Sequence, residues 1–150
     1  MRVTIATESK PSNAGLGGHE GPMRQMILLV EDEEMVRELM CEVLEQAGYE
    51  VLVCSTPAEA IEVSRRHEGP IDLLLTDVVM PGMNGREMAE RIHEFLPQLQ
   101  VVFMSGYTEH ALAHDGKVDP KVEYLQKPFT LKALTQKLAK VLRKLDQQAG

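Results

Sequence analysis

The chain has few cysteines, no excess of basic residues and no long apolar run. Cys41 and Cys54, the two cysteines, form no C-x-x-C pair and show no zinc-type spacing with histidine, so neither a disulfide scaffold nor a structural zinc site is predicted. A formal net charge of −7 argues against sequence-independent binding to nucleic acid or to an anionic membrane. No apolar run reaches the ~18 residues of a membrane span, and the N-terminus does not resemble a signal peptide. We therefore expect a soluble, cytoplasmic protein.

The composition favours one folded domain preceded by a polar N-terminal segment. The chain has 150 residues, of which 43% are hydrophobic, and this is enough for one core but not for two full domains. Residues 1–24 are rich in Gly, Pro and Ser, and the glycines at 15, 17 and 18 are not followed by the Gly-Lys-Ser/Thr of a phosphate loop. We expect a flexible linker or extension over 1–24, a domain over 25–146 and a tail over 147–150.

Short apolar runs alternate with segments of helical periodicity from residue 26 onward. The apolar runs predict strands over 26–30, 49–54, 71–76, 101–104 and 122–126. Helices are predicted after each strand, with Thr56, Asn84 and Thr130 as N-caps, and the helix after the fourth strand is expected to be short. This alternation is typical of an α/β fold with a doubly wound, five-stranded parallel sheet and five helices.

Polar residues follow four of the predicted strands, at the edge where such sheets bind ligands. They are Glu31 and Asp32, then Asp77, Ser105 and Lys127. Three crowded carboxylates repel one another unless a cation lies between them, and an all-oxygen site suits Mg²⁺. Lys127 and the Ser105 hydroxyl could bind phosphoryl oxygens. The pattern therefore predicts a site for Mg²⁺ and a phosphoryl group.

Each of these residues also has an ordinary structural explanation. Residues 31–34 could be a solvated acidic helix start, Asp77 a turn residue, Ser105 a loop residue and Lys127 a surface lysine. Their joint placement at four strand ends favours the functional interpretation over these four separate ones.

Four sequence motifs together resemble the response-regulator receiver domains of two-component signalling. They are LLVEDE at 28–33, LTDVVMPGMNG at 75–85, MSGY at 104–107 and YLQKPF at 124–129. The resemblance covers residues 26 to about 145 and implies the flavodoxin-like strand order 2-1-3-4-5. Glu31 replaces an aspartate that is commoner in the family, and Ser105 stands where threonine is also frequent. Neither difference removes a functional group.

The resemblance implies a phosphorylation site. Asp77 would accept a phosphoryl group from a phosphohistidine on a sensor histidine kinase or a histidine phosphotransfer protein. Glu31, Asp32, Asp77 and the backbone carbonyl of Val79 would hold Mg²⁺. Such a domain is not an enzyme with an external substrate, because it catalyses only its own phosphorylation and dephosphorylation.

The resemblance also implies a switch. Ser105 and Lys127 would bind the phosphoryl group on Asp77, and Tyr124 would turn inward as the Ser105 loop moves. The Lys127–Pro128 bond corresponds to a peptide that is usually cis in the family. Val79 and Tyr107 would flank the approach of the hydrolytic water, where neither can orient it, so slow loss of the phosphoryl group is expected.

Several possibilities remain open at this stage. Residues 146–150 are too few for an output domain, so we expect either a receiver alone or the receiver of a hybrid sensor kinase, with a dimer that forms on phosphorylation as a further option. A phosphohydrolase of the haloacid dehalogenase type also uses an Asp nucleophile and Mg²⁺, but needs a second acid where Val79 stands. A flavin carrier needs a hydroxyl-rich loop where residues 31–34 are acidic.

Overall fold

The computed structural model describes residues 24–106 and 122–149, and within them it contains five strands and four helices. The predicted helix after the fourth strand falls within 107–121, and most of the predicted linker falls within 1–23, so both lie outside the described residues. The strands are β1 (Met26–Val30), β2 (Glu50–Cys54), β3 (Leu73–Asp77), β4 (Gln100–Ser105) and β5 (Val122–Gln126). The helices are α2 (Glu34–Gln46), α3 (Pro57–Arg66), α4 (Gly85–His93) and α6 (Leu131–Ala149).

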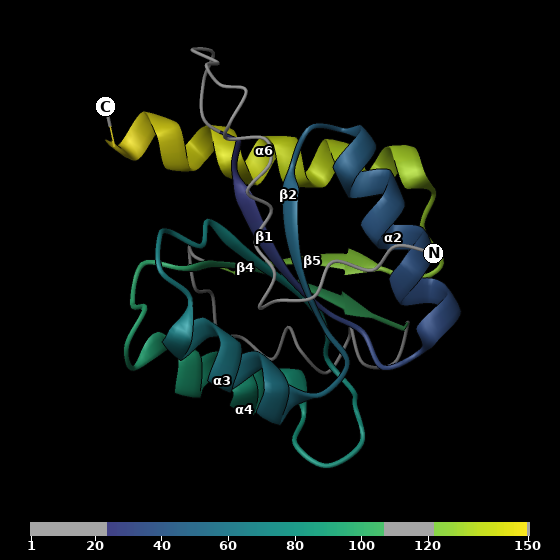
Figure 1. Ribbon diagram of the computed structural model, residues 1–150. Coiled ribbons are helices and arrows are strands. Elements are labelled where there is room, and N and C mark those ends of the chain that lie inside the picture. The colour runs from purple at the N-terminus through teal and green to yellow at the C-terminus, as the bar shows by residue number, and fades with distance from the viewer. Residues whose placement is uncertain (1–23, 107–121, 150) are drawn as a thin grey trace, which may run out of the picture.

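The strands form one parallel sheet in the order β2-β1-β3-β4-β5, which confirms the predicted fold (Figure 1). Every residue of β3, at the centre of this order, is buried. A strand covered on both faces needs apolar side chains on both, and this explains the uninterrupted leucines at 73–75.

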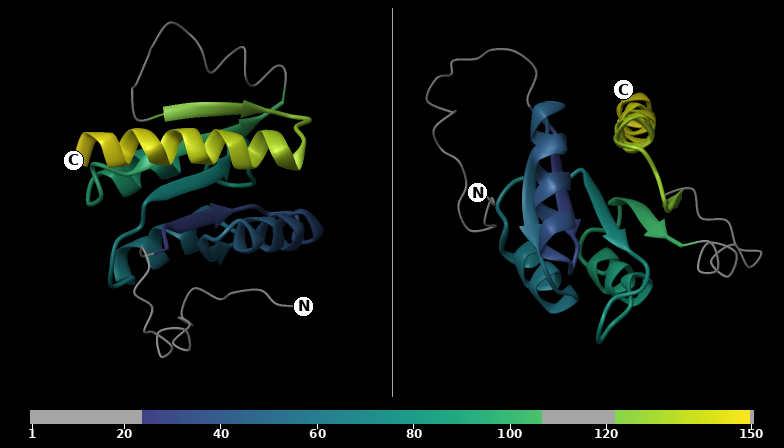
Figure 2. Two further views of the ribbon diagram at one scale, coloured as in Figure 1. Left: turned by 90° about the horizontal axis from the view of Figure 1, so that it is seen from above. Right: turned by 90° about the vertical axis from the view of Figure 1, so that its right-hand side faces the viewer.

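Within the described residues, two helices pack on each face of the sheet. Helices α2 and α6 cover one face, and α3 and α4 cover the other, as the two views of Figure 2 show. Side chains of β1 alternate between these layers: Ile27 and Leu29 pack with α2 and α6, and Leu28 and Val30 pack with α3 and α4. The sheet is packed on both faces, so its strand ends can support a site.

Three predicted N-caps are confirmed. The side-chain oxygens of Thr56, Asn84 and Thr130 each accept a hydrogen bond from the backbone N–H three residues later, at 3.1, 2.9 and 3.0 Å. Such bonds satisfy backbone donors that a helix start leaves free. Helix α2 differs, because its N-cap residue Glu33 makes no side-chain cap hydrogen bond.

Helical spacing alone predicts the apolar face of α2 only in part. It indicates a stripe that includes Leu39 and leaves Cys41 on another face, through Val36, Leu39, Met40, Val43, Leu44 and Ala47. In the structure Cys41 is buried between α2 and the sheet, and Leu39 is exposed. A stripe through Met40, Cys41 and Leu44 also repeats at helical spacing, and the actual packing selects it.

Helix α6 continues to Ala149, into the segment 147–150 that we expected to be a tail. None of the helices in the described part of the chain is both long enough and apolar enough to cross a membrane.

Candidate functional site

The register of the parallel strands brings the predicted site residues together. Val30 pairs with Thr76, so Glu31 follows β1 beside Asp77, the last residue of β3. Asp77 in turn pairs with Met104, which places Ser105 one residue further along β4. Ser105 pairs with Gln126, and Lys127 comes next. Residues almost a hundred positions apart in the sequence therefore lie at the same sheet edge.

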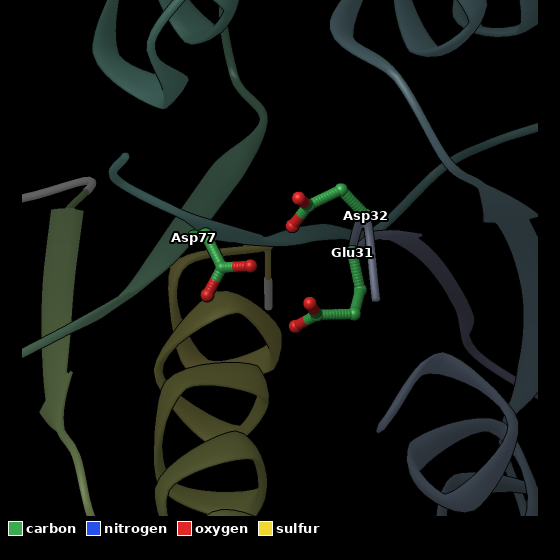
Figure 3. A group of neighbouring side chains, drawn as sticks. All are labelled: Glu31, Asp32 and Asp77. Atoms are coloured by element: carbon green, nitrogen blue, oxygen red, sulfur yellow. The ribbon is translucent and has the colours of Figure 1, made fainter. Parts of the chain in front are cut away.

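Three carboxylates face one another at this edge (Figure 3). One carboxylate oxygen from each of Glu31, Asp32 and Asp77 lies within 4.8 Å of the other two. Glu31 and Asp77 are each only 3% exposed, whereas Asp32 is exposed. The cluster thus has two buried acids and one acid open to solvent.

Glu31 is held in an environment that disfavours its charge. Its Oε2 accepts a hydrogen bond of 3.1 Å from the backbone N–H of Glu33, while its buried Oε1 accepts none from any described residue. Burial, and next the neighbouring Asp77 carboxyl, raise the pKa of Glu31 from 4.5 to about 7.

Lys127 provides the positive charge of the site. Its Nζ lies 2.7 Å from Asp77 Oδ1, and its backbone N–H donates to the carbonyl of Ser105 at 2.8 Å. The Lys127–Pro128 bond is cis, as the resemblance implies. The lysine joins the ends of β3, β4 and β5.

The donor set fits a divalent cation. Three carboxylates face a single ammonium group, and a buried oxygen of Glu31 has no hydrogen-bond donor in the described part of the chain. A cation bound between these oxygens would offset the repulsion among the three carboxylates. It would also offset the cost of burying the Glu31 carboxylate away from water. An all-oxygen set with one exposed side favours a hard cation that keeps some of its water.

The remaining predicted residues lie around this cluster. Ser105 is buried at the end of β4. The Tyr124 ring stacks on Phe103 of the neighbouring strand, with centroids 5.5 Å apart, and packs on the α3 and α4 side of the sheet. The Val79 side chain is 59% exposed. Tyr107, predicted to flank the site, lies outside the described residues.

Two residues that contact the site backbone, Gly85 and Arg37, were not predicted from the sequence. Gly85 N–H donates to the Val78 carbonyl at 2.7 Å, and a Cβ at Gly85 would overlap the carbonyl oxygen of Asp77. Arg37 Nη1 donates to the carbonyls of Glu31 and Asp32, at 2.9 and 3.4 Å. The available signal for Gly85 was a glycine in the first turn of a predicted helix. The available signal for Arg37 was that it is the only basic residue in the acidic segment 31–46.

Known proteins match most of this chain in sequence. The response regulator receiver domain family matches residues 27–139. The response regulator receiver protein CpdR of Brucella abortus is 40% identical over 116 residues, which cover 77% of this chain and 95% of CpdR. The sensor kinase CckA of the same organism is 37% identical over 120 residues, which cover 80% of this chain but only 13% of that kinase.

A solved structure agrees with these sequence matches. The receiver domain of the hybrid histidine kinase CckA superposes with a TM-score of 0.66 at 32% identity, covering 78% of this chain and 98% of that domain. The family match favours a receiver over the phosphohydrolase alternative. With its strand order and its acidic strand ends, the chain belongs to the family of response regulator receiver domains of two-component signalling.

Proposed function

We propose that Asp77 accepts a phosphoryl group from a phosphohistidine in a reaction that requires Mg²⁺. The observation that carries this proposal is the position of the buried Asp77, which lies within 4.8 Å of two further carboxylates and 2.7 Å from Lys127. Phosphoryl transfer needs mainly a positioned nucleophile and neutralisation of the phosphoryl oxygens. The carboxylate and the charges around it meet these two needs.

The side chains have separate roles in the transfer. A carboxylate oxygen of Asp77 forms the new bond to phosphorus while the phosphorus–nitrogen bond of the donor breaks and its electron pair returns to the imidazole. Glu31, Asp32, Asp77 and the carbonyl of Val79 would hold Mg²⁺, which neutralises phosphoryl oxygens when bound. Lys127 exchanges its Asp77 carboxylate partner for a phosphoryl oxygen.

Transfer changes the contacts at the ends of β4 and β5. The new group offers anionic oxygens to Lys127 and to the Ser105 hydroxyl, and the backbones of these residues are already hydrogen-bonded to each other. Movement of Ser105 would therefore affect the start of the β5–α6 connection and the packing of Tyr124 on Phe103. A conformation that binds the phosphoryl group better would become more populated.

The phosphodonor is proposed to be a protein, either a sensor histidine kinase or a histidine phosphotransfer protein. Among the residues whose burial is described, 24–106 and 122–143, four large apolar side chains are exposed. They belong to α2, to α6 or to the loop after β3, and each of these elements follows a strand end at the site edge. They are Met35, Leu39, Val79 and Leu131. Apolar side chains around a charged site would support docking of a protein surface over Asp77.

Intact-mass measurement tests the proposal. After incubation with acetyl phosphate and Mg²⁺, the wild-type chain should gain one phosphoryl group, and Asp77→Asn should gain none. Asp72→Asn is the matched control, because Asp72 lies at the other end of β3 and its replacement keeps an oxygen that can accept from the Met26 N–H. Equal labelling of Asp77→Asn and wild type would overturn the proposal. Sustained turnover of a generic phosphate ester would instead support the phosphohydrolase.

A further inference from the structure

The turn between β1 and α2 is held by hydrogen bonds to β2 and to the Arg37 side chain. At its beginning, the backbone N–H of Glu31 donates to the carbonyl of Cys54 at 3.1 Å, which ties the turn to β2. At its end, the N-cap residue Glu33 makes no side-chain cap hydrogen bond of its own. Arg37, the fourth residue of α2, reaches back to the turn, and its Nη1 donates to the carbonyls of Glu31 and Asp32.

These two carbonyls belong to the residues whose carboxylates form the site. A guanidinium group has a planar set of donors, and a hydrogen bond from a charged donor is stronger than a neutral one. Arg37 is half-buried, so part of this contact is shielded from water. The contact restricts how the backbone can rotate between the end of β1 and the first turn of α2, and this rotation sets the direction of both carboxylates.

We propose that Arg37 is a positioning residue that orients the carboxylates of Glu31 and Asp32 for the cation. The inference rests on the proposed function, since it assigns Arg37 a role in the same metal site. The hydrogen bonds of Arg37 in the described part of the chain go to two backbone carbonyls and not to a carboxylate of the site, so it would act through those carbonyls. Residues that orient metal ligands commonly change metal affinity by about tenfold or more when they are replaced.

Charge and geometry predict opposite effects of removing Arg37. A positive charge beside the site repels a cation, so its removal alone would make Mg²⁺ bind more tightly. Loss of the hydrogen bonds frees the turn and would make Mg²⁺ bind more weakly. The sign of the change in affinity therefore separates a positioning role from a purely electrostatic one.

The experiment compares Mg²⁺ affinity among three variants and the wild type by isothermal titration calorimetry, without a phosphodonor. Arg37→Met removes the charge and the donors but keeps an unbranched side chain of similar reach. Arg37→Lys keeps the charge but lacks the planar fork. Arg91→Met is the matched control, because Arg91 is an exposed arginine near the opposite end of α4 from the site. Urea unfolding with a chelator present reports whether each variant is folded.

We expect Arg37→Met to weaken Mg²⁺ binding by about tenfold, Arg37→Lys to weaken it less, and Arg91→Met to leave it unchanged. Unchanged or tighter binding in Arg37→Met would overturn the inference. If Arg37→Met does not fold, wild-type affinity in Arg37→Lys would overturn it instead. Absence of Mg²⁺ binding in the wild type would overturn the proposed function itself, whereas normal wild-type binding with unaffected Arg37 variants overturns only the role of Arg37.

Discussion

At the scale of single residues, Glu31 makes the stability of the metal-free domain depend on pH. Its pKa is about 7 in the folded chain because of burial and the adjacent Asp77 carboxyl, against 4.5 in an exposed site. Between these pH values the folded state holds a proton that the unfolded state has lost, so the free energy of unfolding falls as pH rises. Above about pH 7 this contribution is constant. The total loss should be at most about 3 kcal/mol.

Urea unfolding in a chelator at about pH 5 and about pH 7.5 measures this loss. Glu31→Gln is neutral at both values, so the wild type should lose more stability than the variant between them. Addition of Mg²⁺ should restore wild-type stability at the higher pH, because a bound cation favours the ionised carboxylate. An identical pH dependence in Glu31→Gln would show that this residue is not the titrating group.

Gly85, the first residue of α4, packs closely against the backbone of Asp77. A methyl group at this position would overlap the Asp77 carbonyl oxygen, so α4 or the end of β3 must shift in Gly85→Ala. We expect a destabilisation of about 1–3 kcal/mol and slower phosphorylation by acetyl phosphate at saturating Mg²⁺. Arg86→Ala changes the next, exposed residue and should leave both quantities unchanged. Wild-type values in Gly85→Ala would mean that the contact is easily relieved.

If Asp77 is phosphorylated as proposed, Val79 should affect how long the phosphoryl group remains. Its exposed apolar side chain follows Asp77 by two residues and cannot orient a water molecule. An amide can do so, and we expect Val79→Asn to lose the phosphoryl group several-fold faster than the wild type after the donor is removed, as followed by intact mass. The conservative variant Val79→Ile should decay at the wild-type rate. The same decay rate in Val79→Asn would show that water orientation at this position does not limit the lifetime.

At the scale of helices and strands, most elements were predictable because their signals are local. The apolar run 26–30 gave the bounds of β1 correctly, and Thr56 was correctly identified as the cap of α3. The buried face of α2 was predicted less well, since residues 36–47 offer two overlapping apolar stripes and only contact with the sheet selects one. Arg37 was missed for a different reason, because a lone basic residue in an acidic segment does not reveal which backbone carbonyls it binds.

The cap of α3 can be tested apart from the site. Thr56 Oγ1 accepts a hydrogen bond of 3.1 Å from the Glu59 N–H, and Thr56→Ala leaves that donor to water. We expect a loss of about 1 kcal/mol in urea unfolding, with unchanged Mg²⁺ affinity and phosphorylation, because α3 contributes no residue to the acidic cluster. Thr56→Ser keeps an acceptor and should retain most of the stability. A change in Mg²⁺ affinity in Thr56→Ala would indicate that α3 is coupled to the site.

At the scale of the whole molecule, the site depends on the strand order. Parallel strands place the residues at or just after the ends of β1, β3, β4 and β5 at one edge, although these residues are far apart in the sequence. The sequence alone predicted this grouping of Glu31, Asp32, Asp77, Ser105 and Lys127 from the periodicity of the chain. The 2.7 Å contact between Lys127 and Asp77 and the burial of Glu31 required the folded structure, since both depend on register and on packing from both faces.

The chemical location of the phosphoryl group is the most direct test of the proposed role of Asp77. Borohydride reduces an acyl phosphate to an alcohol, so a phosphorylated aspartate becomes homoserine, which peptide mass spectrometry can place in the chain. After reaction with acetyl phosphate and Mg²⁺, we predict homoserine at position 77 and at no other aspartate, and none when Mg²⁺ is removed by a chelator. Homoserine at another aspartate in place of position 77, or phosphorylation that persists without Mg²⁺, would contradict the assignment of this strand end as the phosphoacceptor site.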